Sequence, residues 1–261
     1  MKRETVTSAR NPLLVHLKKL LAARSYREAC GEFAADGTKL LEEAAKWYPG
    51  LETVVVQTGV ELCPLPEHVR VVEIPESLMR SVSQMEAPQG AIFICRLPEA
   101  RPAALRPGTL LLDGIQDPGN LGTILRTADA LGLDGVIYSA SCDIYSPKVV
   151  RATMGSLFRV PLCCVPDIAP VLEACRCAGV ETCAAVVSGA AELVGQCRFS
   201  GGTAIVIGNE GNGLPETVAA ACDRRVTIPM HGTIESLNAA MAAGIILWEV
   251  QRTAQDQNGG Q

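Results

Sequence analysis

The sequence predicts an α/β protein with two domains, a smaller amino-terminal α/β domain and a larger domain built on a mainly parallel sheet. Three observations support this fold class. A chain of 261 residues, 48% of them hydrophobic, is long enough to fill two cores. Strand patterns alternate with helical patterns in both halves of the chain. Between the halves, residues 97–107 hold three prolines without a clear period, which is typical of a linker.

These observations place the domain boundaries. We predict a first domain at 1–96, a linker at 97–107 and a second domain at 108–254. The last residues, 255–261, are polar and are predicted to form a disordered tail.

The first half opens with an amphipathic helix. Asn11 and Pro12 suit its cap and first turn, and leucines then recur at helical spacing to about residue 24. Short strands and helices alternate after it, which predicts a small α/β sandwich. They are predicted as strand 32–35, helix 38–47, strands 53–57 and 69–74, helix 76–82 and strand 91–95.

Strand and helix patterns alternate more regularly in the second half of the chain. Its strands are predicted at 109–112, 135–138, 180–187, 204–207 and 225–228, and its helices near 121–131, 147–154, 168–178, 215–221 and 236–250. Such alternation predicts a parallel sheet with helices on both faces. Ligands of open α/β sheets bind beyond the carboxyl ends of the strands, so the loops that follow these strands are the candidate site.

Charge and composition limit the partners and the compartment. The net charge of −5 argues mildly against nucleic acid, but residues 1–40 carry eight basic and four acidic side chains, a local charge of +4. That balance fits local RNA docking, and it equally fits a solvated helix face. The first ten residues lack the apolar segment of a signal peptide and no apolar run could cross a bilayer, so we expect a cytoplasmic protein without a membrane partner.

The eleven cysteines are odd in number and scattered. They are expected to stay reduced and to pack as small apolar groups. With only three histidines and no C-x-x-C pair, a zinc site is not expected, and we predict no bound metal.

The first of three unusual loops runs from Asp117 to Thr127. A Pro-Gly-Asn turn follows the strand at 109–112 and leads into a helix with an apolar inner face. Asn120, Thr123 and Arg126 recur every three residues and share the opposite face. A helix dipole does not favour arginine in an early turn, so Arg126 is predicted either to form a structural ion pair or, given Asn120 and the glycine-rich turn beside it, to serve function.

The second loop, 207–216, places Gly208, Gly211 and Gly213 directly after a strand, where glycine permits close approach of a ligand to the backbone. Its G-x-x-G-x-G spacing differs from the dinucleotide-binding fingerprint G-x-G-x-x-G. This difference argues against the interpretation that the protein is a nucleotide-dependent oxidoreductase. Glu210 lies inside the loop. It is interpreted either as a solvated carboxylate or as an acceptor for backbone or arginine donors.

The third loop, 228–238, closes a strand with Ile228, Pro229 and Met230 and leads into a helix rich in alanine. Ser236 is predicted to cap that helix. Asn238, two positions later, has no structural role that the sequence explains.

Taken in this order and at these distances, the three loops resemble the motifs of the SpoU/TrmH family of the SPOUT superfamily, which comprises S-adenosylmethionine-dependent RNA ribose 2′-O-methyltransferases. The resemblance covers residues 108–250. It implies a trefoil-knot domain that forms a homodimer through the knotted face. It further implies that the cofactor S-adenosylmethionine lies against Gly208, Ile228, Met230 and Leu237. The reacting region implied by the resemblance comprises Asn120, Arg126, Glu210, Ser236 and Asn238.

The amino-terminal part is similar, more loosely, to the L30e-like substrate-binding domain of family members that act on rRNA. The segments that carry this similarity are 8–12, 32–41 and 88–92. The resemblance therefore implies methylation of 23S rRNA, with RNA held through the basic amino-terminal region. The alternatives are the same chemistry on tRNA and a non-catalytic RNA-binding protein of ribosome assembly.

Overall fold

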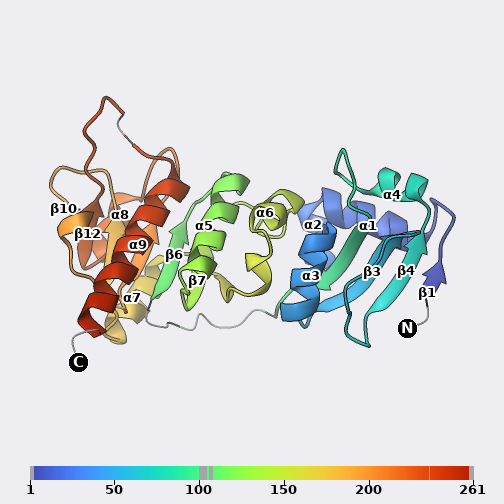
Figure 1. Cartoon of the computed structure of the whole chain (residues 1–261). Helices are drawn as coiled ribbons and strands as arrows, with labels where there is room; N and C mark the ends of the chain where they lie inside the picture. The colour runs from blue at the N-terminus through green and yellow to red at the C-terminus, as the bar shows by residue number, and fades with distance from the viewer. Residues whose placement is uncertain (1–2, 100–104, 106–107, 201, 235, 259–261) are drawn as a thin grey trace. The chain divides into compact units, whose positions relative to one another are not determined.

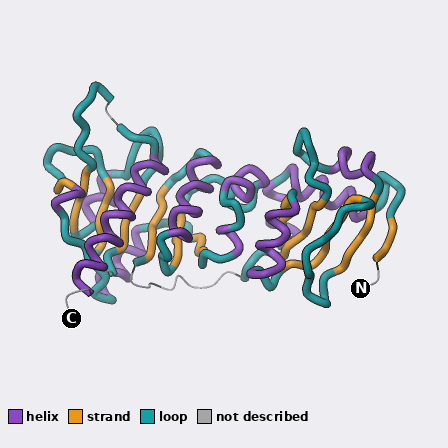
Figure 2. Tube along the Cα trace, in the orientation of Figure 1, coloured by secondary structure: helices purple, strands orange, loops and turns teal. Residues whose placement is uncertain are grey.

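The computed structural model describes residues 3–99, 105, 108–200, 202–234 and 236–258 (Figures 1 and 2). The chain divides into two compact units. The amino-terminal unit comprises Met1–Glu99 together with Asp143–Arg159, and the carboxyl-terminal unit comprises Ala100–Cys142 together with Val160–Gln261. Within the described residues, no helix is both long and apolar enough to span a bilayer.

The amino-terminal unit is built on a five-stranded sheet of order β1-β4-β3-β5-β2. β1, β4 and β3 pair in parallel, whereas β5 runs antiparallel to both β3 and β2. The strands are β1 (Arg3–Thr5), β2 (Glu32–Asp36), β3 (Leu51–Gln57), β4 (Arg70–Ile74) and β5 (Ala91–Arg96). The helices of residues 1–99 are α1 (Pro12–Ala22), α2 (Arg24–Cys30), α3 (Thr38–Trp47) and α4 (Glu76–Val82).

Local sequence accounts for most of these elements. The Asn11 side chain accepts a hydrogen bond from the backbone N–H of Leu13 at 2.9 Å and so caps α1, as its position before Pro12 predicts. Leu14, Leu17, Leu20 and Leu21 of α1 are buried in one core with residues of β2–β5 and α4. The helix predicted at 12–24 ends at Ala22, because Ala23 adopts an extended conformation from which α2 begins.

The segment 143–159 completes the amino-terminal unit, although sequence analysis assigned it to the second domain. It contains α6 (Pro147–Ala152), which packs against β2. Arg27 of α2 is 5% exposed and forms an ion pair with Asp143. Tyr145 and Phe158 join Phe33 in an aromatic cluster. Packing across more than a hundred residues of sequence therefore decides this boundary, and no local pattern reports it.

The carboxyl-terminal unit holds a seven-stranded sheet of order β10-β12-β9-β11-β6-β7-β8, and every pairing in it is parallel. The strands are β6 (Thr109–Asp113), β7 (Gly135–Ser139), β8 (Leu162–Cys164), β9 (Thr182–Ala185), β10 (Glu192–Leu193), β11 (Ala204–Ile207) and β12 (Arg224–Thr227). The helices are α5 (Pro118–Ala130), α7 (Ala169–Cys177), α8 (Glu216–Ala221) and α9 (Ala239–Asn258). This confirms the predicted mixed α/β fold with a parallel sheet.

The last helix differs from its prediction at both ends. α9 begins at Ala239, three residues after the predicted start, and packs against α5. It continues to Asn258, so residues 255–258 are helical and not part of a disordered tail. Residues 259–261 and most of the predicted linker lie outside the described residues.

Candidate active site

The three unusual loops gather at one edge of the parallel sheet. They follow β6, β11 and β12, and the carboxyl ends of parallel strands lie on the same side of a sheet. β6 and β11 are direct neighbours in the sheet, and only β9 separates β11 from β12. Segments distant in sequence therefore come together at one edge of the sheet.

Glu210 connects the first loop to the second. Its carboxylate accepts hydrogen bonds from the backbone N–H groups of Gln116 at 3.0 Å and Asp117 at 2.9 Å, and from Asn120 Nδ2 at 3.2 Å. Burial alone would raise the pKa of this carboxyl. The hydrogen-bond donors outweigh burial and hold the pKa of Glu210 below its ordinary value. Glu210 is therefore a fixed anion and not a solvated one.

Asn238 connects the third loop to the first. Its Nδ2 donates to Asn120 Oδ1 at 2.8 Å, while its Oδ1 accepts from the backbone N–H groups of Ala240 at 2.9 Å and Met241 at 3.2 Å. Asn238 is thus the residue that caps α9. The prediction that Ser236 caps the helix is wrong, because the helix begins three residues later. Asn238, Asn120 and Glu210 form one continuous polar network.

The second loop is tightly folded on its own backbone. A Cβ on Gly208 would lie 2.5 Å from the carbonyl carbon of Gly213, so no other residue fits without moving the loop. Asn209 stabilises the turn, since its Oδ1 accepts from the backbone N–H groups of Gly211 at 2.9 Å and Asn212 at 3.0 Å. Its Nδ2 donates to the carbonyl of Gly114 at 2.8 Å and so holds the first loop.

Arg126 differs from its neighbours. It is exposed on α5, on the face that carries Asn120 and Thr123. Within the part of the chain that the structure describes, the guanidinium makes no hydrogen bond or ion pair. The structural ion pair that the sequence left open is therefore absent from the described residues, and the side chain is available to a ligand.

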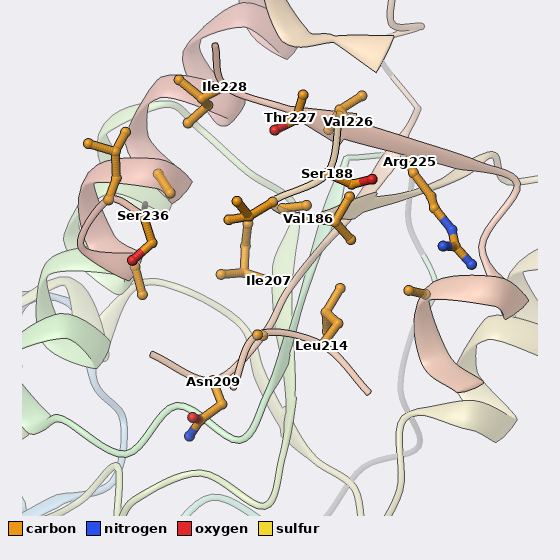
Figure 3. A pocket seen from close by; sticks show the side chains of 18 of the residues that line it. Val186, Ser188, Ile207, Asn209, Leu214, Arg225, Val226, Thr227, Ile228 and Ser236 are labelled. Atoms are coloured by element: carbon orange, nitrogen blue, oxygen red, sulfur yellow. The ribbon is translucent and has the colours of Figure 1, made fainter. Parts of the chain in front are cut away.

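A cavity of about 610 Å³ lies beside this network, within the range of small-molecule sites. Figure 3 shows Ile207 between Ile228 and Ser236 on one side and Arg225 on the other. The lining includes all four residues predicted to hold a cofactor, together with two of the predicted reacting residues. These are Gly208, Ile228, Met230 and Leu237, joined by Glu210 and Ser236. Asn120, Arg126 and Asn238 are not among the lining residues.

Several lining residues were missed by sequence analysis. Val186, Val187 and Ser188 follow β9, and Leu214 and Arg225 also reach the cavity. Only one signal could have found the β9 group, namely that β9 lies between β11 and β12. That order depends on crossovers, which local patterns do not encode.

No cysteine is among the described residues that line the cavity. Burial raises the pKa of Cys183 to about 12 and that of the half-buried Cys222 to about 11, so both thiols stay protonated near neutral pH. Among the described residues, no three His, Cys, Asp or Glu side chains come together as a metal would require.

Comparison with known proteins decides the family. The model of the SpoU rRNA methylase family matches residues 107–248, more than half of the chain. The chain belongs to the SpoU rRNA methylase family. The model of the MRM3-like substrate binding domain matches residues 11–92.

Relatives match across both units. The chain is 30% identical to the 23S rRNA (guanosine(2553)-2′-O)-methyltransferase RlmP of Bacillus subtilis, over 94% of this chain and 98% of that protein. It is 34% identical to the 23S rRNA (uridine(2479)-2′-O)-methyltransferase of Streptomyces viridochromogenes, over 94% and 91%. Among solved structures, the AdoMet-bound rRNA methyltransferase of Sinorhizobium meliloti aligns with a TM-score of 0.84 and 30% identity, over 96% and 98% of the two chains.

Proposed function

We propose that this protein is an S-adenosylmethionine-dependent methyltransferase that modifies a ribose 2′-hydroxyl in RNA, with 23S rRNA as the substrate class. Family membership and two relatives that carry this activity on 23S rRNA support the proposal. The single observation that carries it in the structure is the polar network of Glu210, Asn120 and Asn238 beside a cavity of cofactor size. We also propose that the protein is cytoplasmic, because bacteria such as Bacillus subtilis and Streptomyces viridochromogenes make and modify rRNA in the cytoplasm.

The cavity fits the cofactor by its chemistry. Ile207, Ile228 and Leu237 offer an apolar surface for an adenine ring, and a ligand can approach the backbone closely at Gly208, Gly211 and Gly213, which have no side chains. We propose that Gly208, Ile228, Met230 and Leu237 hold the adenosine. The bound cofactor supplies a methyl group on positively charged sulfur, so the protein has only to orient the hydroxyl and manage its proton.

Arg126 is proposed to activate that hydroxyl. Arginine stays protonated in nearly all proteins, so its role here is to stabilise the negative charge that develops on the ribose oxygen. The proton then leaves to water or to an RNA phosphate. The exposed guanidinium, without a partner in the described part of the chain, is free to meet the substrate.

The remaining predicted residues are proposed to position this reaction. Asn120 lies between Glu210 and Asn238 and can orient the substrate ribose or Arg126, because both neighbours hold its amide. Glu210 fixes the first loop through the backbone at Gln116 and Asp117. Ser236 lines the cavity and shapes the third loop.

RNA is proposed to dock on the amino-terminal unit. The first 40 residues carry a net charge of +4 on a protein of −5, and the unit matches a substrate-binding domain. The two 23S rRNA relatives match 94% of this chain and so share both units, which favours rRNA over tRNA.

A knotted homodimer completes the proposal. The exposed residues Met241, Ile245 and Trp248 recur at helical spacing on α9, and Trp248 is 59% exposed. Burial of this stripe against a second copy agrees with the trefoil-knot dimer implied by the family. Sedimentation of the wild type and of Trp248→Glu tests the dimer, since a monomeric wild type would contradict it.

Two measurements test the function. Mapping of 2′-O-methyl groups in RNA from cells with and without the gene should reveal one site that depends on it, and failure to find any such site would contradict the proposal. Calorimetry with S-adenosylhomocysteine separates the enzyme from a non-catalytic RNA-binding protein, because a pure binder needs no cofactor cavity.

A further inference from the structure

Among the described residues that line the cavity, one has a positively charged side chain. That residue is Arg225 of β12, whose guanidinium Nη2 lies 2.6 Å from Glu216 Oε1. A second bond joins Nη1 to Glu216 Oε2 at 3.3 Å, and Glu216 also lines the cavity. Figure 3 places Arg225 across the cavity from Ile228 and Ser236. The cavity thus has an apolar side and a side that carries both signs of charge.

The ion pair between Arg225 and Glu216 can open to bind a ligand. Its side chains are 38% and 77% exposed, so water screens the attraction, and opening such a pair costs about 1 kcal/mol or less. Glu210, the other acid of the lining, is held by the first loop through three hydrogen bonds. Glu216 and Arg225 are therefore the charged lining groups that remain available.

The charged end of the proposed cofactor matches this pair. Its amino acid end carries a carboxylate and an ammonium on one carbon, so a receptor needs a cation and an anion side by side. A guanidinium binds a carboxylate through two parallel hydrogen bonds, and a glutamate accepts hydrogen bonds from an ammonium. We propose that Arg225 binds the carboxylate and Glu216 the ammonium of S-adenosylmethionine. This assignment rests on the proposed function and adds two binding residues to it.

Two ligands isolate the interaction. S-adenosylhomocysteine carries the amino acid end, whereas 5′-methylthioadenosine shares the adenosine and lacks that end. Calorimetry on the full chain should show that Arg225→Met weakens S-adenosylhomocysteine binding about tenfold, the loss of one charge-assisted contact, while methylthioadenosine affinity changes less than about twofold. Glu216→Gln should act in the same direction and more weakly, and Arg225→Lys should retain part of the affinity.

Arg176→Met is the matched control, because it removes an exposed Arg–Glu pair with Glu173, at 2.9 Å, that does not line the cavity. Equal effects of Arg225→Met on both ligands, or no effect on either, would overturn the proposed roles of Arg225 and Glu216 and leave the proposed function standing. A wild-type protein that binds neither ligand would overturn the proposed function and these two roles together. Circular dichroism of each variant establishes that it is folded.

Discussion

Glu210 and Arg126 differ in how the structure holds their side chains. Glu210 accepts three hydrogen bonds that join two loops, and these donors lower its pKa. Arg126 is exposed and has no partner within the described residues. The difference separates a frame, formed by Glu210, Asn120 and Asn238, from an exposed side chain that we propose meets the substrate. Changes in the frame should affect stability and activity together, whereas a change at Arg126 should affect activity alone.

Arg126→Ala should give the largest effect on turnover. We propose that Arg126 stabilises the developing oxyanion, so its loss should lower kcat by about a thousandfold. The affinity for S-adenosylhomocysteine and the melting temperature should stay near wild type, because the side chain has no partner to lose. Single-turnover methylation of RNA measures the loss, and retained turnover would remove Arg126 from the mechanism.

Gly208→Ala should cost the most stability, because it distorts the second loop, which also carries Glu210 of the frame. The new Cβ would lie 2.5 Å from the Gly213 and Leu214 backbone, so the second loop must shift. We expect a loss of stability of about 2–3 kcal/mol by analogy with overpacking, together with weaker cofactor binding. Gly211→Ala is the control, since a Cβ there meets only the Asn209 side chain at 3.5 Å. Urea denaturation of both variants compares them, and equal stabilities would contradict the close packing.

Glu210→Gln tests the anion at the centre of the frame. In the variant, one N–H of the glutamine amide would face a backbone N–H that donates to the carboxylate in the wild type. This should lower the free energy of unfolding by about 1–2 kcal/mol at pH 7. Because the folded-state pKa of Glu210 is lowered, its contribution is present above the unfolded pKa of about 4.3 and is lost as pH falls through the folded value. Denaturation at several pH values should show the two proteins converging in acid. A difference independent of pH would contradict the role of charge.

Among the three variants expected to lower stability, Asn238→Ala should have the smallest effect, about 1 kcal/mol for the lost cap of α9. Asn238→Asp keeps the cap and removes the donor to Asn120, so it should restore stability while activity stays low. Ser236→Ala should leave unfolding unchanged. If Ser236→Ala proved the more destabilising, the helix start at Ala239 would be in question. Thermal melts combined with methylation assays separate these cases.

Sequence predicted those parts of the molecule that local patterns determine. The glycine and asparagine loops after β6, β11 and β12 could be located because turn residues mark strand ends, and α3 was predicted at its observed bounds, Thr38–Trp47. The start of α9 was missed because Ser236 and Asn238 are both good caps, and only the structure shows that Asn238 accepts from the backbone N–H groups of Ala240 and Met241. The break at Ala23 carries no glycine or proline signal.

Long-range packing explains the other differences. Tyr145 and Phe158 look like ordinary apolar residues of the second domain, and only their contact with Phe33 shows where they belong. Arg225 lines the cavity because β12 lies beside β9, an order that crossovers set. No periodic pattern in the sequence predicts either of these arrangements.

The core of the amino-terminal unit includes residues 143–159, and this affects folding during synthesis and the outcome of proteolysis. During synthesis, the first 99 residues leave the ribosome without Asp143 to neutralise the buried Arg27 and without Phe158 beside Phe33. The unit can finish folding only after about sixty more residues have emerged. A single cut in the proline-rich stretch would therefore release a fragment with an open core, so swapping this unit between enzymes requires two grafts.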